Sequence, residues 1–158
     1  MLQKLQNIRK KESGFTIIEV MIVLAVAGLI MVIVLVAVPQ LQRNQRNSAR
    51  RDVAGRIKSE IDAFAGNNNG NIPSEGNDAT NGISGGFTSR YLAGVDYKNP
   101  STGNSYTFAA ATPTADGMSY RLNTKCSGES YVAAGGNRTY SLIVLLEGGA
   151  LYCVDNSD

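Results

Sequence analysis

The chain contains no histidine and no tryptophan, and only two of its 158 residues are cysteines, Cys126 and Cys153. Without histidine, the usual Ser-His and Cys-His catalytic pairs and the common metal-ligand clusters cannot be built. Asp116, Asp155 and Asp158 have no organised ligand spacing, so we expect them to be solvated acids in turns. This inventory argues against an enzyme, a cofactor and a metal centre.

Proline is also scarce, with four residues, whereas glycine is abundant, with seventeen. Together with many Asn, Ser and Thr residues, this composition predicts short strands with many turns rather than a helical bundle. The chain is long enough for one small domain of about 120 residues beyond its N-terminal segments.

Charged and polar side chains are absent from the nineteen residues between Val20 and Val38. A helix of this length covers roughly 28 Å, close to the ~30 Å core of a bilayer, so we predict one membrane-spanning helix. Glu19 lies at the start of this run, where an unpaired carboxylate is costly and marks a candidate functional residue. A glutamate that snorkels to the lipid head groups is the alternative interpretation.

Before this run, residues 1–14 are polar and net basic and show no core pattern, which is typical of a targeting segment. A secretory signal peptide would have a shorter apolar region and small residues at its cleavage site, whereas this run ends in Val38 and Pro39. A plain N-terminal membrane anchor is the second alternative.

The segment from Lys10 to Met21 reads Lys-Lys-Glu-Ser-Gly-Phe-Thr-Ile-Ile-Glu-Val-Met. It resembles the class III signal of type IV pilins and pseudopilins, in which a basic leader ends in glycine and Phe-Thr, two hydrophobic residues and glutamate follow. The resemblance is close over residues 9–65 and concerns only the architecture beyond them. It implies a pilin, and we expect the major subunit of a filament.

The resemblance implies that a prepilin peptidase cuts between Gly14 and Phe15 and methylates the new Phe15 amine. In the family, the glutamate at the position of Glu19 is thought to pair with that amine on a neighbouring subunit during assembly. Processed subunits leave the cytoplasmic membrane through an assembly platform with a motor ATPase and form a helical homo-oligomeric filament. We therefore expect a single-pass protein with its N-terminus inside, and an extracellular pilus after assembly.

Six basic residues and one acidic residue occur between residues 43 and 58. We call Arg43, Arg46, Arg50 and Arg51 the arginine collar. The collar weakly contradicts a cytoplasmic N-terminus by the positive-inside rule, so the expected orientation comes from the resemblance alone. Three partners fit the collar: anionic head groups, acidic groups of neighbouring subunits, and DNA. DNA fits least well, because no aromatic residues alternate with the arginines to stack on bases.

Within the span, Gly28 and Pro39 are the two residues expected to weaken the helix. By the resemblance, Gly28 occupies a position at which the helix can lose regular hydrogen bonding in a filament. Melting from Gly28 toward Pro39 is therefore our hypothesis for the assembled state. A kink at the membrane exit is the alternative role of Pro39.

Beyond the span, four apolar residues recur with a helical period. They are Val53, Ile57, Ile61 and Phe64. This pattern predicts an amphipathic half of the helix over residues 40–65 that packs on a globular domain, with Gly66 as its left-handed cap.

We predict that residues 66–104 form a long loop, which corresponds to the αβ-loop of the family that the chain resembles. The expected strands are Ser105–Ala110, Met118–Asn123, Ser130–Ala134, Thr139–Leu146 and Ala150–Asp155, of which Thr139–Leu146 is expected to be central. We therefore predict an α+β fold, the type IV pilin fold, with a long N-terminal helix packed on four or five antiparallel strands. The predicted organisation is 1–14, leader; 15–39, filament-core helix; 40–65, amphipathic half; 66–104, loop; and 105–158, sheet with a C-terminal disulfide loop.

The resemblance also implies a disulfide between Cys126 and Cys153, because many type IV pilins have a C-terminal disulfide of this kind. Two buried free thiols are the alternative. The run from Asn99 to Tyr106 resembles the pseudopilin pattern Asp-Pro-x-Thr-Gly-x-x-Tyr, with Asn99 in place of the acid, which puts a metal site there in doubt.

These observations lead us to expect the structural subunit of a type IV pilus that serves adhesion or motility. A minor pilin, or a pseudopilin of a secretion or competence system, is the alternative within the family. A membrane-anchored adhesion domain is the alternative outside it.

Overall fold

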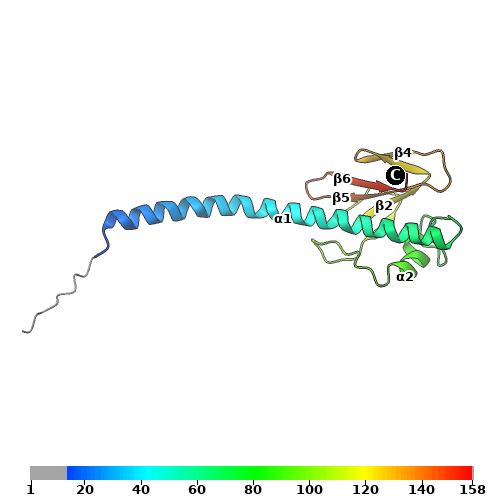
Figure 1. Ribbon diagram of the computed structural model, residues 1–158, viewed down its shortest axis with the longest axis horizontal. Coiled ribbons are helices and arrows are strands. Elements are labelled where there is room, and N and C mark those ends of the chain that lie inside the picture. The colour runs from blue at the N-terminus through cyan, green and yellow to red at the C-terminus, as the bar shows by residue number, and fades with distance from the viewer. Residues whose placement is uncertain (1–13, 158) are drawn as a thin grey trace, which may run out of the picture. The chain divides into compact units, whose positions relative to one another are not determined.

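The computed structural model describes residues 14–157, so the predicted leader up to residue 13 and Asp158 lie outside the described residues. The chain divides into two units, Met1–Gln40 and Leu41–Asp158. The long helix α1, Ile17–Asn67, begins in the first unit and ends in the second (Figure 1).

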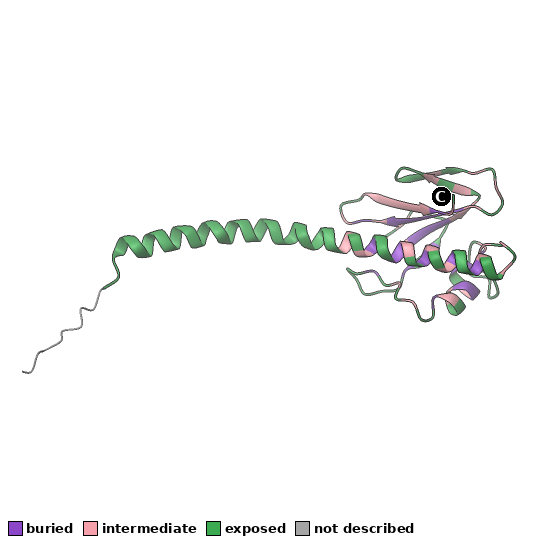
Figure 2. Cartoon of the chain, in the orientation of Figure 1, coloured by how far each residue is buried: buried purple, intermediate pink, exposed green. Residues whose placement is uncertain are grey.

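In the first unit, the described chain is almost entirely helix. Every large apolar side chain from Ile17 to Val38 is at least 43% exposed, and Figure 2 shows this segment as exposed throughout. Exposed apolar surface of this extent needs a covering of lipid or protein, and the segment is long and apolar enough to cross a membrane. The helix is continuous through Gly28 and Pro39, so neither residue interrupts α1 in the single chain.

In the second unit, α1 is amphipathic, as its apolar period predicts. The residues that it buries are Arg50, Val53, Ala54, Ile57, Ile61 and Phe64. The apolar members of this set form one core with side chains of the sheet, including the fully buried Tyr120 and Tyr140. The period of a single helix face therefore identified the packing surface correctly.

The end of α1 differs from the prediction. The helix continues through Gly66 to Asn67, and the left-handed backbone occurs at Asn69 and Gly70, with φ of 56° and 78°. The Gly70 N–H donates to the carbonyl oxygen of Ala65 at 2.8 Å, which satisfies one of the last free carbonyls of the helix. Asparagine tolerates this conformation better than other residues with a side chain.

Six strands form two sheets in the second unit. They are β1 Thr107–Ala109, β2 Gly117–Leu122, β3 Thr124–Ser127, β4 Ser130–Ala133, β5 Tyr140–Leu145 and β6 Leu151–Asp155. The larger sheet has the order β1-β2-β5-β6, and β3 and β4 form a separate two-stranded sheet. Strand β5 lies between β2 and β6 with its first five residues buried, which confirms the prediction of a central strand.

Two features of the sheets were not predicted. Strand β1 pairs in parallel with β2, so the larger sheet is predominantly rather than wholly antiparallel. Strand β3 was missed, because Thr124–Ser127 lacks the alternation of apolar and polar residues that marks a half-buried strand. Its pairing with β4 forms a hairpin that only the tertiary structure reveals.

The predicted αβ-loop contains two short helical turns, the π-helical η1, Ile83–Phe87, and α2, Thr88–Tyr91. Ser84, Gly85 and Gly86 read as loop residues in the sequence. The glycines instead permit close backbone contact, because a Cβ on Gly85 would lie 2.2 Å from the carbonyl oxygen of Asp78.

Candidate functional site

The predicted cleavage site lies directly before α1. Gly14, Phe15 and Thr16 are not helical, and the side chain of Phe15 is 84% exposed. Apart from its chain neighbours, no described atom lies within 4 Å of a Cβ placed on Gly14. The Gly14–Phe15 bond therefore lies outside the helix, and no described side chain covers it.

Thr16 and Glu19 form a capping box at the N-terminus of α1. The Thr16 backbone N–H and Oγ1 donate to Glu19 Oε2 at 2.8 and 2.7 Å, and the Glu19 N–H donates to Thr16 Oγ1 at 3.3 Å. This reciprocal contact satisfies two backbone donors that an uncapped helix leaves free. The Thr-x-x-Glu spacing is the sequence signature of this cap, which we did not predict.

Only one carboxylate oxygen of Glu19 takes part in the capping box. Within residues 14–157, Glu19 Oε1 has no hydrogen-bond partner. The carboxylate can therefore cap its own helix and still accept a bond from a group outside the chain.

Residues 9–35 match the family model described as the prokaryotic N-terminal methylation motif. The chain carries the class III signal of type IV pilins and pseudopilins. This match confirms the resemblance seen in the sequence, and the α+β fold with its long N-terminal helix agrees with a pilin-like chain. No curated protein and no solved structure gives a significant match.

The arginine collar divides into two kinds of residue. Arg46 donates from Nε and Nη2 to the two carboxylate oxygens of Glu147 at 2.6 and 2.8 Å. Arg50 is 4% exposed and donates to the Leu145 carbonyl oxygen at 2.6 Å and to Ser101 Oγ at 3.0 Å. Arg46 and Arg50 thus bind groups within the second unit, whereas we expected partners outside the chain.

Glu147 is the centre of this network and lies in the turn between β5 and β6. Ser101 Oγ donates to its carboxylate at 2.5 Å. The side-chain amide of Asn47 donates from Nδ2 to the Glu147 carbonyl oxygen at 3.2 Å and accepts at Oδ1 from the Glu147 N–H at 2.7 Å. The hydrogen bond from Arg46, followed by the one from Ser101, lowers the pKa of Glu147 to about 2. The network joins the hairpin turn to α1 and to the loop before β1.

The two remaining collar residues, Arg43 and Arg51, are exposed. The Arg51 guanidinium lies over the ring of Tyr152, 5.5 Å from its centroid. An arginine over an aromatic ring keeps its charge accessible on one side. Arg43 and Arg51 are therefore the collar residues whose side chains remain exposed.

The predicted disulfide is confirmed. Cys126 in β3 is bonded to Cys153 in β6, with their Cα atoms 5.8 Å apart. Asp155 lies next to this bridge, is 7% exposed and accepts a hydrogen bond from the Cys126 N–H. The expectation that Asp155 is a solvated turn acid is therefore wrong, because the hairpin of β3 and β4 covers it.

Asp116 lies in a turn and is half-buried, as expected for a turn acid, but its carboxylate is also bound within the chain. Its carboxylate accepts hydrogen bonds from Asn99 Nδ2 at 2.7 Å, Thr102 Oγ1 at 2.6 Å and Asn104 Nδ2 at 3.0 Å. These bonds, led by the one from Thr102, lower the pKa of Asp116. The fully buried Asn99 thus supplies a hydrogen-bond donor where the pseudopilin pattern has an acid. Within residues 14–157, no group of three or more His, Cys, Asp or Glu side chains gathers.

Proposed function

We propose that the chain is the structural subunit of a type IV pilus. The observation that carries this proposal is the class III signal at residues 9–35, which extends into the first part of α1, where the apolar side chains are exposed. A cleavable leader followed by an uncovered apolar helix suits a subunit that waits in a bilayer and then exchanges lipid for identical helices. The activity of the chain is polymerisation, and it requires no catalysis and no cofactor.

Cleavage after Gly14 creates a cationic amine on Phe15, next to the capping box. In the filament, that amine pairs with the free oxygen of Glu19 on a neighbouring subunit. Two opposite charges in an apolar environment are far less costly when paired than when bare, so the pair sets the axial register of otherwise similar apolar helices. The capping box supports this role because it fixes the position of the Glu19 carboxylate.

The remaining parts of the chain have proposed roles in the same cycle. The N-terminus faces the cytoplasm, where a prepilin peptidase removes the leader and methylates Phe15, and the second unit lies outside. An assembly platform with its motor ATPase extracts the subunit from the cytoplasmic membrane. Arg43 and Arg51 contact head groups before assembly and acidic groups of neighbours after it. The segment from Gly28 to Pro39 loses helical hydrogen bonds on packing.

Mass spectrometry of the mature protein, combined with shearing of surface filaments, tests the proposal. We expect a chain that begins at N-methylated Phe15 and dominates the sheared filament fraction by mass. As controls, Gly14→Trp blocks processing and Gly14→Ala permits much of it. A trace amount in the fraction would indicate a minor pilin or pseudopilin, absence would indicate an anchored surface domain, and an uncut N-terminus would refute the proposal.

A further inference from the structure

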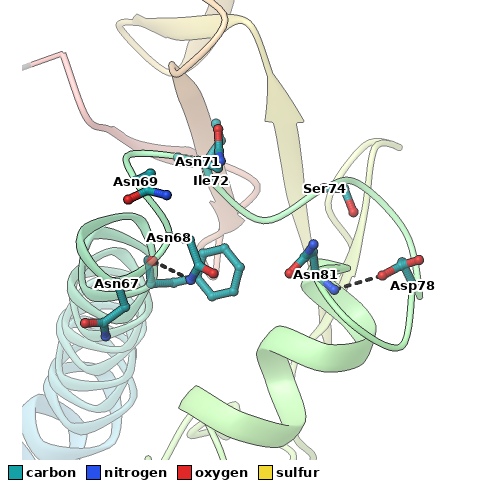
Figure 3. A pocket seen from close by; sticks show the side chains of 9 residues that line it. Asn67, Asn68, Asn69, Asn71, Ile72, Ser74, Asp78 and Asn81 are labelled. Carbon is teal, nitrogen blue, oxygen red and sulfur yellow. Dashed lines mark hydrogen bonds between the residues drawn. The ribbon is translucent and has the colours of Figure 1, made fainter.

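An open pocket of about 460 Å³ lies where α1 ends and the αβ-loop begins. Five asparagines contribute to its lining, namely Asn67, Asn68, Asn69, Asn71 and Asn81. Figure 3 shows Asn67, Asn68 and Asn69 at the end of α1 on one side, and Ser74, Asp78 and Asn81 on the other. Segments separated by about ten residues therefore bring amide groups to one concave surface.

The backbone that carries these amides is held by local hydrogen bonds. Asn68 Nδ2 donates to the Phe64 carbonyl oxygen at 2.8 Å, and the Asn71 N–H donates to the Asn68 carbonyl oxygen at 3.0 Å. On the other side, Asp78 Oδ1 accepts from the N–H groups of Thr80 and Asn81 at 2.9 and 2.8 Å. Such a preformed wall loses little conformational freedom when a ligand binds.

Three of the amides are free to bind a ligand. Among residues 14–157, the side chains of Asn69, Asn71 and Asn81 make no hydrogen bond, and all three residues are exposed. Each amide offers two donors and a carbonyl acceptor. Together they present donors and acceptors side by side, which matches groups that both donate and accept, such as hydroxyls.

The other lining residues restrict the class of ligand. Ile72 is half-buried and adds apolar surface that can contact the C–H face of a ring, whereas Phe64 lies beneath the pocket, buried in the core. Asp78 is the only ionisable lining residue, and the hydrogen bonds from the N–H groups of Asn81 and Thr80 lower the pKa of its carboxyl group. A pocket with one carboxylate and no lysine or arginine disfavours anions, and a single carboxylate is a poor cation site.

We propose that this pocket binds a neutral carbohydrate, a single sugar unit that is either free or part of a surface glycan. The free amides of Asn71 and Asn81 bind its hydroxyls, while Ile72 contacts its apolar face. This site is independent of the proposed filament function, because every residue that forms it belongs to the second unit.

Titration of the full chain with galactose, mannose and N-acetylglucosamine tests this site. The protein is kept in lauryldimethylamine oxide, a detergent without a sugar head group, and the asparagine side-chain amides are followed by NMR. We expect saturable shifts of Asn69, Asn71 and Asn81 with at least one sugar. For a single sugar unit, Kd should be on the order of 1 mM.

The double substitution Asn71→Ala/Asn81→Ala should weaken this binding at least about tenfold, because it removes two amide partners. Asn137→Ala is the matched control, since Asn137 is also exposed but lies outside the pocket. An unchanged near-UV circular dichroism spectrum shows that the variants are folded.

Three results would overturn the proposal. The first is no saturable shift with any of the three sugars, and the second is equal weakening by Asn137→Ala and the double substitution. The third is saturable binding of tetraglycine in place of the sugars, which would assign the pocket to a peptide. Because the readout is binding by the single chain, failure here leaves the filament proposal intact, and failure of filament assembly leaves this site intact.

Discussion

The two parts of α1 have the same backbone and opposite surroundings. From Ile17 to Val38 every large apolar side chain is exposed, whereas Val53, Ile57 and Phe64 are buried in the core of the second unit. The first part has no partner within the described chain, so lipid or other subunits must cover it. The second part finds its partner in the sheet of its own chain. One helix thus has an uncovered apolar part at its beginning and a part packed in the core of the second unit at its end.

The sharpest test of the first part is Glu19→Gln. This substitution keeps an acceptor for the capping box but removes the charge, so we expect intact processing and complete loss of filaments in the sheared fraction. Thr16→Ala is the complementary control, because it removes the threonine hydroxyl from the cap and keeps the charge of Glu19. Normal filaments from Glu19→Gln would show that charge does not set the register.

A pair of isoleucines contrasts the two parts directly. Ile57 is fully buried, and Ile57→Ala should lower the free energy of unfolding of the second unit by about 2–5 kcal/mol. Ile30 is 55% exposed, and Ile30→Ala should leave that free energy unchanged. Thermal unfolding of the full chain in detergent, followed by near-UV circular dichroism of the tyrosines, measures both. Equal effects of the two substitutions would contradict the division of α1.

The disulfide stabilises the second unit only. Cys126 and Cys153 are 27 residues apart, so Cys126→Ser/Cys153→Ser should cost about 3–4 kcal/mol in the chain-entropy treatment. Membrane insertion and processing at Gly14 should not change, because the bridge has no part in the first unit. The same unfolding experiment with and without reductant checks the effect, and a wild-type chain insensitive to reductant would argue against it.

The smallest effect concerns Glu147 and depends on pH. Its pKa is about 2 in the folded chain, against an ordinary value of 4.5. Because the folded value is the lower one, the stabilisation is fully present above pH 4.5 and is lost as the pH falls toward 2. Glu147→Gln should therefore flatten the decrease in melting temperature over this window. Parallel curves for the two proteins would show that the contact with Arg46 contributes little.

Local sequence patterns predicted the structural features that depend on residues close together in the chain. The spacing of Val53, Ile57 and Phe64 identified the buried face of α1, and the run up to Val38 identified the exposed one. Local sequence patterns did not predict η1 or β3. In η1, the glycines permit close backbone contact and do not mark a loop. Strand β3 forms because it pairs with β4.

Sequence alone therefore determined the signal at Gly14 to Glu19, the apolar length of the helix and the amphipathic face that follows, because each depends on residues within a few turns. Only the tertiary structure decided the partners of the collar. Arg46 binds Glu147, 101 positions away in the chain, while Arg43 stays exposed, although the sequence presents both as similar exposed cations. Such contacts form only when the turn between β5 and β6 folds back on α1, and no local pattern encodes that approach.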